Sequence, residues 1–122
     1  MAPSYQVIVA DDDASIRAVL AHIVQQTYPG ATVSAVADGL AALHIYDQQG
    51  ADLVLTNYMM PRMSGLDLIA ALRARQVTLP IIMVSGEVAQ APAALAAGAT
   101  LFLAKPFTRT QLVQVLMSVL PP

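Results

Sequence analysis

The chain has 122 residues, enough for one domain that buries a hydrophobic core without disulfides or structural metals. It contains no cysteine, so thiol catalysis and cysteine-based metal sites are excluded. Hydrophobic residues make up 57% of the sequence and the net charge is −2, which excludes a disordered tail and argues against direct binding of nucleic acid. Because no apolar run could cross a membrane and the first residues do not resemble a secretion signal, we expect one cytoplasmic domain over residues 1–122, with no membrane partner.

Four short apolar runs predict buried β-strands. They are continuous rather than alternating, which is typical of parallel strands that are covered by helices on both faces. A fifth segment, residues 32–37, is rich in β-forming residues but less apolar, which favours a strand at the edge of the sheet. The four apolar runs are residues 7–10, 53–55, 81–84 and 101–104.

A helical pattern follows each predicted strand. Residues 16–24 carry apolar side chains at helical spacing, and residues 88–97 are rich in alanine with a proline near their start. Asp38, Ser64 and Thr108 are expected to cap the second, third and fifth helices. The regular alternation predicts a doubly wound α/β fold, with a parallel sheet between two layers of helices.

Polar residues follow the C-terminal ends of several predicted strands. The first strand leads into three aspartates, residues 11–13, the fourth ends at Ser85, and the fifth leads into Lys105. Such strand ends meet at one edge of a parallel sheet, where ligands bind. Carboxylates suit Mg²⁺, and a lysine and a hydroxyl suit phosphoryl oxygens. A nucleophile is missing between them, because Asn57 occupies that place after the third strand.

The chain resembles the receiver domain of two-component response regulators over nearly all its length. The resemblance implies a flavodoxin-like sheet of five parallel strands in the order 2-1-3-4-5. It also implies an aspartate at the end of the third strand that accepts phosphate from a histidine kinase or a phosphotransfer protein. Four segments in the right order carry the resemblance: VIVADDDASIRAVL, DLVLTNYMMPRMSGLDLI, PIIMVSGE and LFLAKPF.

By position, the resemblance implies a magnesium site, in which Asn57 in place of an aspartate is expected to weaken or abolish Mg²⁺ binding. Asp11 and Asp12 match the acidic pair that holds Mg²⁺, with Asp12 binding it directly and Asp11 mainly through water. Asn57 stands at the phosphoacceptor position and would face the metal, and Met59 would offer its backbone carbonyl.

The resemblance also implies phosphoryl-binding and switch residues. Ser85 and Lys105 match the two residues that contact the phosphoryl group, and Ser85 is expected to shift on activation. Phe102 matches the aromatic switch position, although an ordinary core role is favoured for it. The bond from Lys105 to Pro106 matches one that is usually cis.

Asn57 departs from the family pattern. A carboxamide is not a nucleophile that forms an acyl phosphate, because its nitrogen lone pair is delocalised and its oxygen carries no formal charge. Asp52 cannot replace it, because Asp52 lies at the other end of the same predicted strand. We therefore expect no aspartyl phosphate on this chain.

Three functions stay open on the residues alone. The first is a receiver domain in which an aspartate has been exchanged for Asn57 by engineering, and the second is a natural pseudo-receiver that binds proteins without phosphorylation. Retention of the acidic pair, Ser85 and Lys105 favours the first. The third, a small phosphatase or phosphotransferase, is disfavoured, because the chain has the Asp-x-Asp pattern only formally and has no substrate-binding insertion.

The last predicted helix carries apolar residues on more than one side. If one set faces the core, Val115 and Met117 are left on other faces with few charges nearby. In the family the fourth helix, fifth strand and fifth helix often form a dimer or output-domain surface, so a partner is expected there. The expected core-facing set is Leu112, Leu116, Val119 and Leu120.

Overall fold

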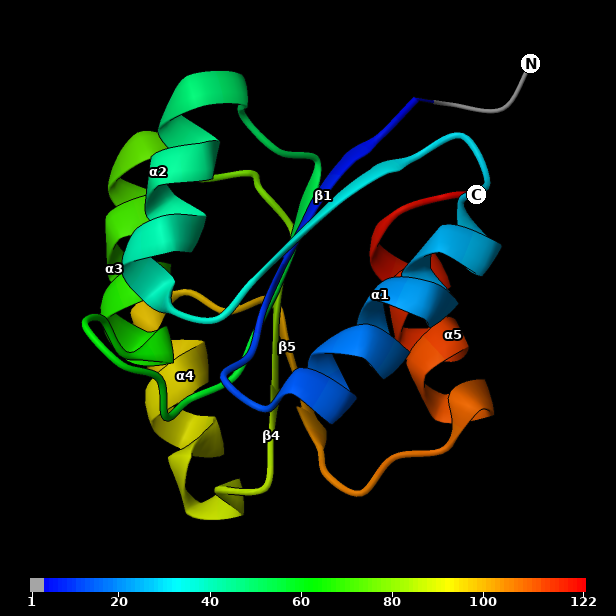
Figure 1. The fold of residues 1–122 in the computed structure, drawn as a ribbon. Helices are drawn as coiled ribbons and strands as arrows, with labels where there is room; N and C mark the ends of the chain where they lie inside the picture. Colours follow the sequence, from blue (N-terminus) through cyan, green and yellow to red (C-terminus); the bar gives the residue numbers. More distant parts are fainter. Residues whose placement is uncertain (1–3) are drawn as a thin grey trace.

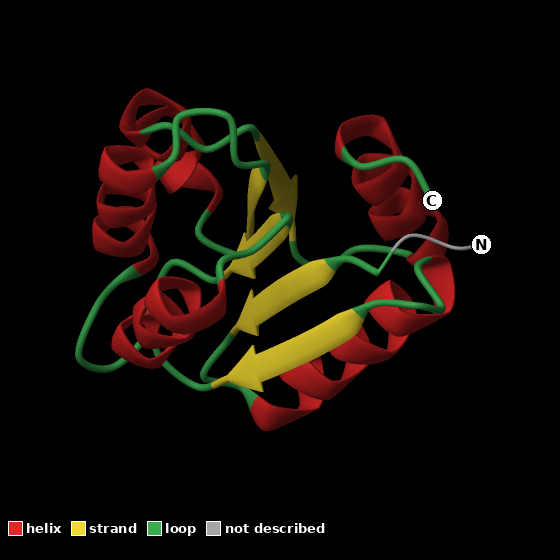
Figure 2. Cartoon of the chain, turned by 90° about the horizontal axis from the view of Figure 1, so that it is seen from above, coloured by secondary structure: helices red, strands yellow, loops and turns green. Residues whose placement is uncertain are grey.

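The computed structural model describes residues 4–122 and consists of a parallel sheet between two layers of helices (Figures 1 and 2). The strand order is β2-β1-β3-β4-β5, which confirms the doubly wound fold. Helices α1 and α5 cover one face of the sheet, and α2, α3 and α4 cover the other (Figure 1). The strands are β1 (Gln6–Ala10), β2 (Thr32–Val36), β3 (Leu53–Thr56), β4 (Ile81–Ser85) and β5 (Leu101–Ala104). The helices are α1 (Ala14–Thr27), α2 (Gly39–Gln49), α3 (Gly65–Arg75), α4 (Ala91–Ala97) and α5 (Arg109–Val119).

Burial follows the position of each strand in the sheet. Every residue of β3 and β4 is buried, as is all of β1 after its first residue, which explains their continuous apolar runs. The outer strand β2 is half-buried or exposed along its length, as expected for an edge strand. Successive side chains point to opposite faces, so Ile8 packs against α2 and α3 while Val9 packs against α1 and α5.

The predicted caps of three helices are confirmed. Asp38, Ser64 and Thr108 each accept a hydrogen bond from a backbone N–H in the first turn of α2, α3 and α5, respectively. Asp13 caps α1 in the same way. Capping gives hydrogen-bond partners to the backbone N–H groups in the first turn, which have no partner within the helix. The caps therefore fix the residue at which each helix begins.

The predicted helix over residues 88–97 begins later than expected. A single 3₁₀ turn, Val88–Gln90, precedes α4, and the α-helix itself starts at Ala91. Proline has no N–H and its ring collides with the carbonyl four residues earlier, which here belongs to Val88. Pro92 therefore fits in the first turn of α4 but cannot continue a helix that began at Val88.

The last helix packs more fully than its sequence suggests. Leu112 and Leu116 are buried, and Met117 is 48% exposed, as predicted. The expectation for Val115 was wrong, because this residue is half-buried against the core. The reason is that α5 contacts α1 as well as the sheet, so a wider face of the helix is covered. No helix within residues 4–122 is long and apolar enough to span a membrane.

Candidate functional site

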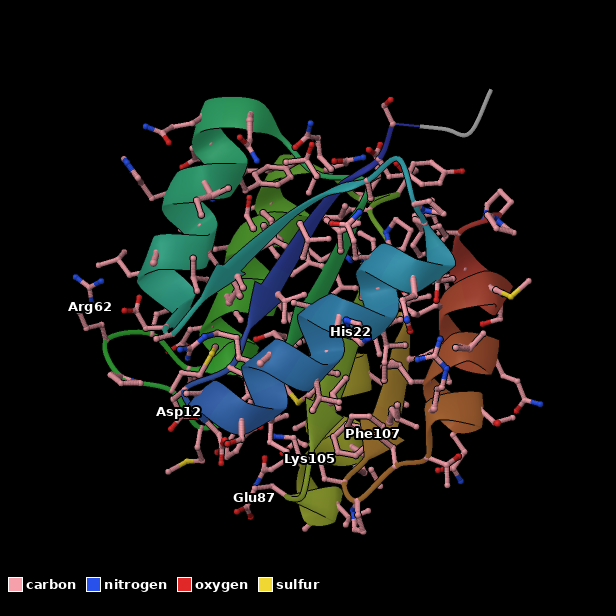
Figure 3. The ribbon with its side chains drawn as sticks, turned by 45° about the vertical axis from the view of Figure 1, so that its right-hand side comes forward. Asp12, His22, Arg62, Glu87, Lys105 and Phe107 are labelled. Carbon is pink, nitrogen blue, oxygen red and sulfur yellow. The ribbon has the colours of Figure 1, made fainter. Side chains whose placement is uncertain are left out.

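The predicted site residues lie at the carboxyl edge of the sheet, which is the edge where all five parallel strands end. The register aligns the ends of neighbouring strands, because Ala10 pairs with Thr56, and Ser85 pairs with Ala104. Asp12, Glu87 and Lys105 consequently lie at the same end of the molecule (Figure 3).

Asp11 and Lys105 form a buried ion pair. The Asp11 side chain is fully buried, and its Oδ2 accepts a hydrogen bond from Lys105 Nζ at 2.9 Å. Its Oδ1 accepts a second bond from the backbone N–H of Asp13 at 2.9 Å. The Lys105 side chain is 19% exposed, so its ammonium group is the charge that balances a carboxylate removed from water.

Asn57 connects two loops of the site. Its side-chain nitrogen Nδ2 donates to Asp12 Oδ1 and to the backbone carbonyl of Met59, each at 3.1 Å. A carboxylate and a carbonyl can only accept hydrogen bonds, so the amide presents its nitrogen to both. Asp12 and the Met59 carbonyl, two of the positions that the resemblance assigns to a metal site, therefore meet at Asn57.

The donors present fit a divalent cation of the magnesium type. Mg²⁺ prefers oxygen ligands and is commonly held by one or two carboxylates and water. Within residues 4–122, no group of three or more acidic or histidine side chains is arranged as a metal site. The available protein ligands are therefore the two carboxylates of Asp11 and Asp12, together with the carbonyl of Met59.

Ser85 is at the edge but is engaged in a local turn. Its hydroxyl oxygen accepts a hydrogen bond from the backbone N–H of Glu87 at 3.0 Å, and the residue is buried. Glu87 itself is exposed. Ser85 therefore holds the turn after β4, and its hydroxyl hydrogen is still free to be donated.

The remaining predicted positions lie in or near β5. Phe102 is half-buried and packs against the core beneath α2, α3 and α4. The peptide bond between Lys105 and Pro106 is cis. Phe107 packs on the opposite side of the sheet, against the core beneath α1 and α5.

Arg17 and Gly65 support the site, although sequence reasoning assigned them no role. Arg17 Nη1 donates to the backbone carbonyl of Asp11 at 2.8 Å and so holds the turn between β1 and α1. The backbone N–H of Gly65 donates to Tyr58 O at 2.8 Å, and a side chain at Gly65 would overlap the carbonyl oxygen of Asn57. The only sequence signal for Arg17 was that it is the sole arginine or lysine in α1.

A second polar contact holds the loop after β3. Arg62 Nη2 donates to Asp38 Oδ2 at 2.9 Å, and Arg62 has a left-handed backbone with φ of 66°. A hydrogen bond from the N–H of Ala41 lowers the pKa of Asp38, and Arg62 lowers it further. This carboxylate therefore stays ionised to lower pH than a free aspartate and keeps the loop beside Asn57 in place.

Comparisons with known proteins match the chain to one family. The family model described as response regulator receiver domain matches residues 7–117. The transcriptional regulatory protein SphR of Synechococcus elongatus is 34% identical over 122 aligned residues, which cover 91% of this chain and 47% of SphR. The sensory transduction protein RegX3 of Mycobacterium tuberculosis is 36% identical over 116 residues, which cover 93% of this chain and 50% of RegX3. The chain thus spans about half the length of these relatives.

Solved structures show the same architecture. The chemotaxis response regulator CheY4 of Vibrio cholerae has a TM-score of 0.84 and 30% identity, with 97% of this chain and 100% of CheY4 covered. The receiver domain of sensor histidine kinase PA1611 from Pseudomonas aeruginosa, with a magnesium ion coordinated in its active site cleft, has a TM-score of 0.84, 26% identity and coverage of 96% and 98%. Because the family model covers most of the chain and the fold agrees, the chain belongs to the response regulator receiver domain family of two-component signal transduction.

Proposed function

We propose that residues 1–122 form a receiver domain whose phosphoacceptor position is occupied by Asn57. The observation that carries the proposal is that Asn57 follows β3 directly and its amide lies 3.1 Å from Asp12 Oδ1. An aspartate at this position would place a carboxylate oxygen beside Asp12 and the Met59 carbonyl. The asparagine keeps the shape of that side chain but cannot attack a phosphoryl group.

The other site residues take roles that follow from their chemistry. Asp12, Met59 O and Asp11 would hold Mg²⁺, which offsets negative charge on an incoming phosphoryl group. Lys105 would bind one phosphoryl oxygen, because its ammonium group already lies at this edge, 2.9 Å from Asp11. Ser85 would donate its hydroxyl hydrogen to another phosphoryl oxygen. Phe102 would act as the switch residue that responds to this contact.

The exchange at position 57 has two explanations. Either an aspartate has been replaced by engineering, or the chain is a natural pseudo-receiver that binds its partners without phosphorylation. Retention of Asp11, Asp12, Ser85 and Lys105 together favours the first, because an interaction module has no need for the whole set of metal-binding and phosphoryl-binding residues. In the first case the partner is a histidine kinase or a phosphotransfer protein.

The surface formed by α4, β5 and α5 is the proposed site for a second copy or an output domain. Residues 88–104 contain no charged residue, and Leu95 of α4 is 50% exposed. An uncharged, partly apolar surface is suited to a protein partner rather than to nucleic acid.

Intact mass after treatment with acetyl phosphate and Mg²⁺ tests the proposal. We expect no mass gain for this chain and the gain of one phosphoryl group for Asn57→Asp. A matched control adds Asp52→Asn to Asn57→Asp, because Asp52 lies at the opposite end of β3 and its loss should leave the gain unchanged. A phosphoryl group on Asn57 itself, or none on Asn57→Asp, would contradict the proposal.

A further inference from the structure

We propose that the side-chain amide of Asn57 replaces the divalent cation inside the chain and competes with Mg²⁺ for the same oxygens. The proposal rests on the proposed function, because it concerns the same site. It goes further in stating that the chain holds its own site closed to the metal. The absence of an aspartate's negative charge at position 57 would not by itself close the site to the metal.

The Asn57 amide contacts the same kind of oxygen atoms that a bound cation would contact. An amide nitrogen carries two hydrogens, and here two acceptors lie 3.1 Å from it. Asp12 belongs to the loop between β1 and α1, and Met59 belongs to the loop between β3 and α3. The amide therefore joins two loops by contacting an oxygen of each, as a shared metal ion would.

The orientation of the amide excludes a cation from those oxygens. If the group were turned by half a rotation, its Oδ1 would face a carboxylate oxygen and a carbonyl oxygen, and all three would repel one another. A metal ion needs these same oxygens. Binding therefore requires Asn57 Nδ2 to leave both acceptors, which breaks one hydrogen bond to a charged group and one to a neutral group.

Both oxygens of Asp11 already accept a hydrogen bond from the protein. Its Oδ2 accepts from Lys105 Nζ and its Oδ1 accepts from the N–H of Asp13, each at 2.9 Å. Among the carboxylate and carbonyl oxygens assigned to the metal, only Asp12 Oδ2 has no donor within the described part of the chain. Every other oxygen in this set already accepts a protein hydrogen bond.

Two models of how Asn57 affects Mg²⁺ binding make opposite predictions for Asn57→Ala. If Asn57 is simply a poor ligand, removal of its side chain leaves the Mg²⁺ affinity unchanged or lowers it. If the amide competes with the metal, removal frees Asp12 Oδ1 and Met59 O, and the affinity rises.

Calorimetric titration with MgCl₂ decides between them. We expect the Kd of Asn57→Ala to be at least about fivefold lower than that of the present chain, because that factor corresponds to the net contribution of one hydrogen bond and two must break. Asn57→Ser serves as the second variant, because its side chain is polar but too short to bridge both oxygens, and it should behave as Asn57→Ala does. An equal or higher Kd in the folded variants would overturn the proposal.

A second readout follows the amide itself. In ¹⁵N-labelled protein, the side-chain NH₂ signal of Asn57 should shift when saturating Mg²⁺ displaces it, while the NH₂ signal of Gln49 at the other end of the fold should not. A signal of Asn57 that does not move at saturation would also overturn the proposal. Neither result bears on whether Asn57→Asp takes up phosphate, so the proposed function is tested separately.

Discussion

The two edges of the sheet place their acidic side chains in different surroundings. At the carboxyl edge, Asp11 is fully buried, and both of its oxygens accept hydrogen bonds. At the amino edge, Asp52 is exposed, and one oxygen accepts a bond from the N–H of Gln6 at 2.8 Å. Both residues adjoin an apolar strand in the sequence. The direction of the strand decides which acid is brought beside other polar groups and which remains in water.

The ion pairs differ in the same way. Lys105 and Asp11 join β5 to β1 in the interior of the carboxyl edge, whereas Arg75 and Asp47 join the exposed C-terminal ends of α3 and α2 near the amino edge. A buried carboxylate depends on its partner, because water cannot replace the lost charge. In an exposed pair, water can solvate the charge that remains when its partner is removed.

The largest effect is expected for Lys105→Met. This change leaves the buried Asp11 without its balancing charge, and we expect unfolding to become easier by about 3–5 kcal/mol in urea melts. Arg75→Met is the matched control and should change the free energy of unfolding little, because both partners of that pair are exposed. Equal losses in the two variants would show that burial does not distinguish the two edges.

Asn57→Asp is expected to have the next largest effect. Without metal, the new carboxylate repels Asp12 and loses both donated hydrogen bonds, so we expect a loss of about 1–3 kcal/mol in urea melts with chelator. Salt should reduce the loss, and excess Mg²⁺ should narrow it, because a metal that binds only the folded state stabilises that state.

The control for this change is Asp52→Asn at the amino edge. This reverse exchange, of an acid for an amide, should change the free energy of unfolding little. If Asn57→Asp is as stable as the present chain in chelator, the acidic side chains do not converge at the carboxyl edge as the structure indicates.

Gly65→Ala tests the close packing of the carboxyl edge. The added Cβ would overlap the carbonyl oxygen of Asn57 and press on Met83, so the start of α3 must move away. Overpacking outweighs the gain in helix propensity, and we expect a net loss of about 1–2 kcal/mol in the free energy of unfolding. Gly86→Ala is the control at the same edge, because its Cβ would meet only open space. If Gly65→Ala leaves the free energy of unfolding unchanged, α3 does not need to approach Asn57 so closely.

The smallest effect is expected for Tyr28→Phe at the amino edge. The hydroxyl of Tyr28 is buried and donates to Leu120 O at 2.8 Å, and its loss should cost about 1 kcal/mol near neutral pH. Tyr5→Phe is the exposed counterpart, because its hydroxyl donates to Pro121 O at 2.7 Å near the surface, and it should cost less.

The effect of Tyr28→Phe should also depend on pH. Burial, and to a lesser extent the neighbouring Tyr5, raises the pKa of Tyr28 from 10.0 to about 12. The tyrosine therefore ionises in the unfolded chain before it does so in the folded chain, and the stability it contributes is lost as pH rises between these values. Urea melts of both proteins should show the difference between them shrinking over this range, and a constant difference would contradict the burial of the hydroxyl.

Much of the fold was predictable from local patterns. Continuous apolar runs indicated the buried strands, and Asp38, Ser64 and Thr108 were recognisable as caps, because both signals depend on residues close together in the chain. The alanine-rich pattern predicts a helix that begins at residue 88, whereas Pro92 cannot continue an α-helix that begins at Val88 and α4 begins at Ala91. Helical spacing describes one covered face and leaves Val115 outside it, whereas α5 is covered by both α1 and the sheet.

The residue types of the candidate site could be read from the chain, because they follow strands whose direction sets the edge at which they gather. Their hydrogen bonds depend on distances between loops that lie far apart in the sequence. That an amide stands at the position of the expected nucleophile is evident from the amino acids alone. The folded arrangement was needed to show that its nitrogen faces Asp12 and Met59, and that Asp11 is buried against Lys105. It also showed that Arg17 and Gly65 hold the surrounding backbone. Hydrogen-bond direction and burial arise only when several strands and loops are assembled at one edge, so no single strand or helix contains them.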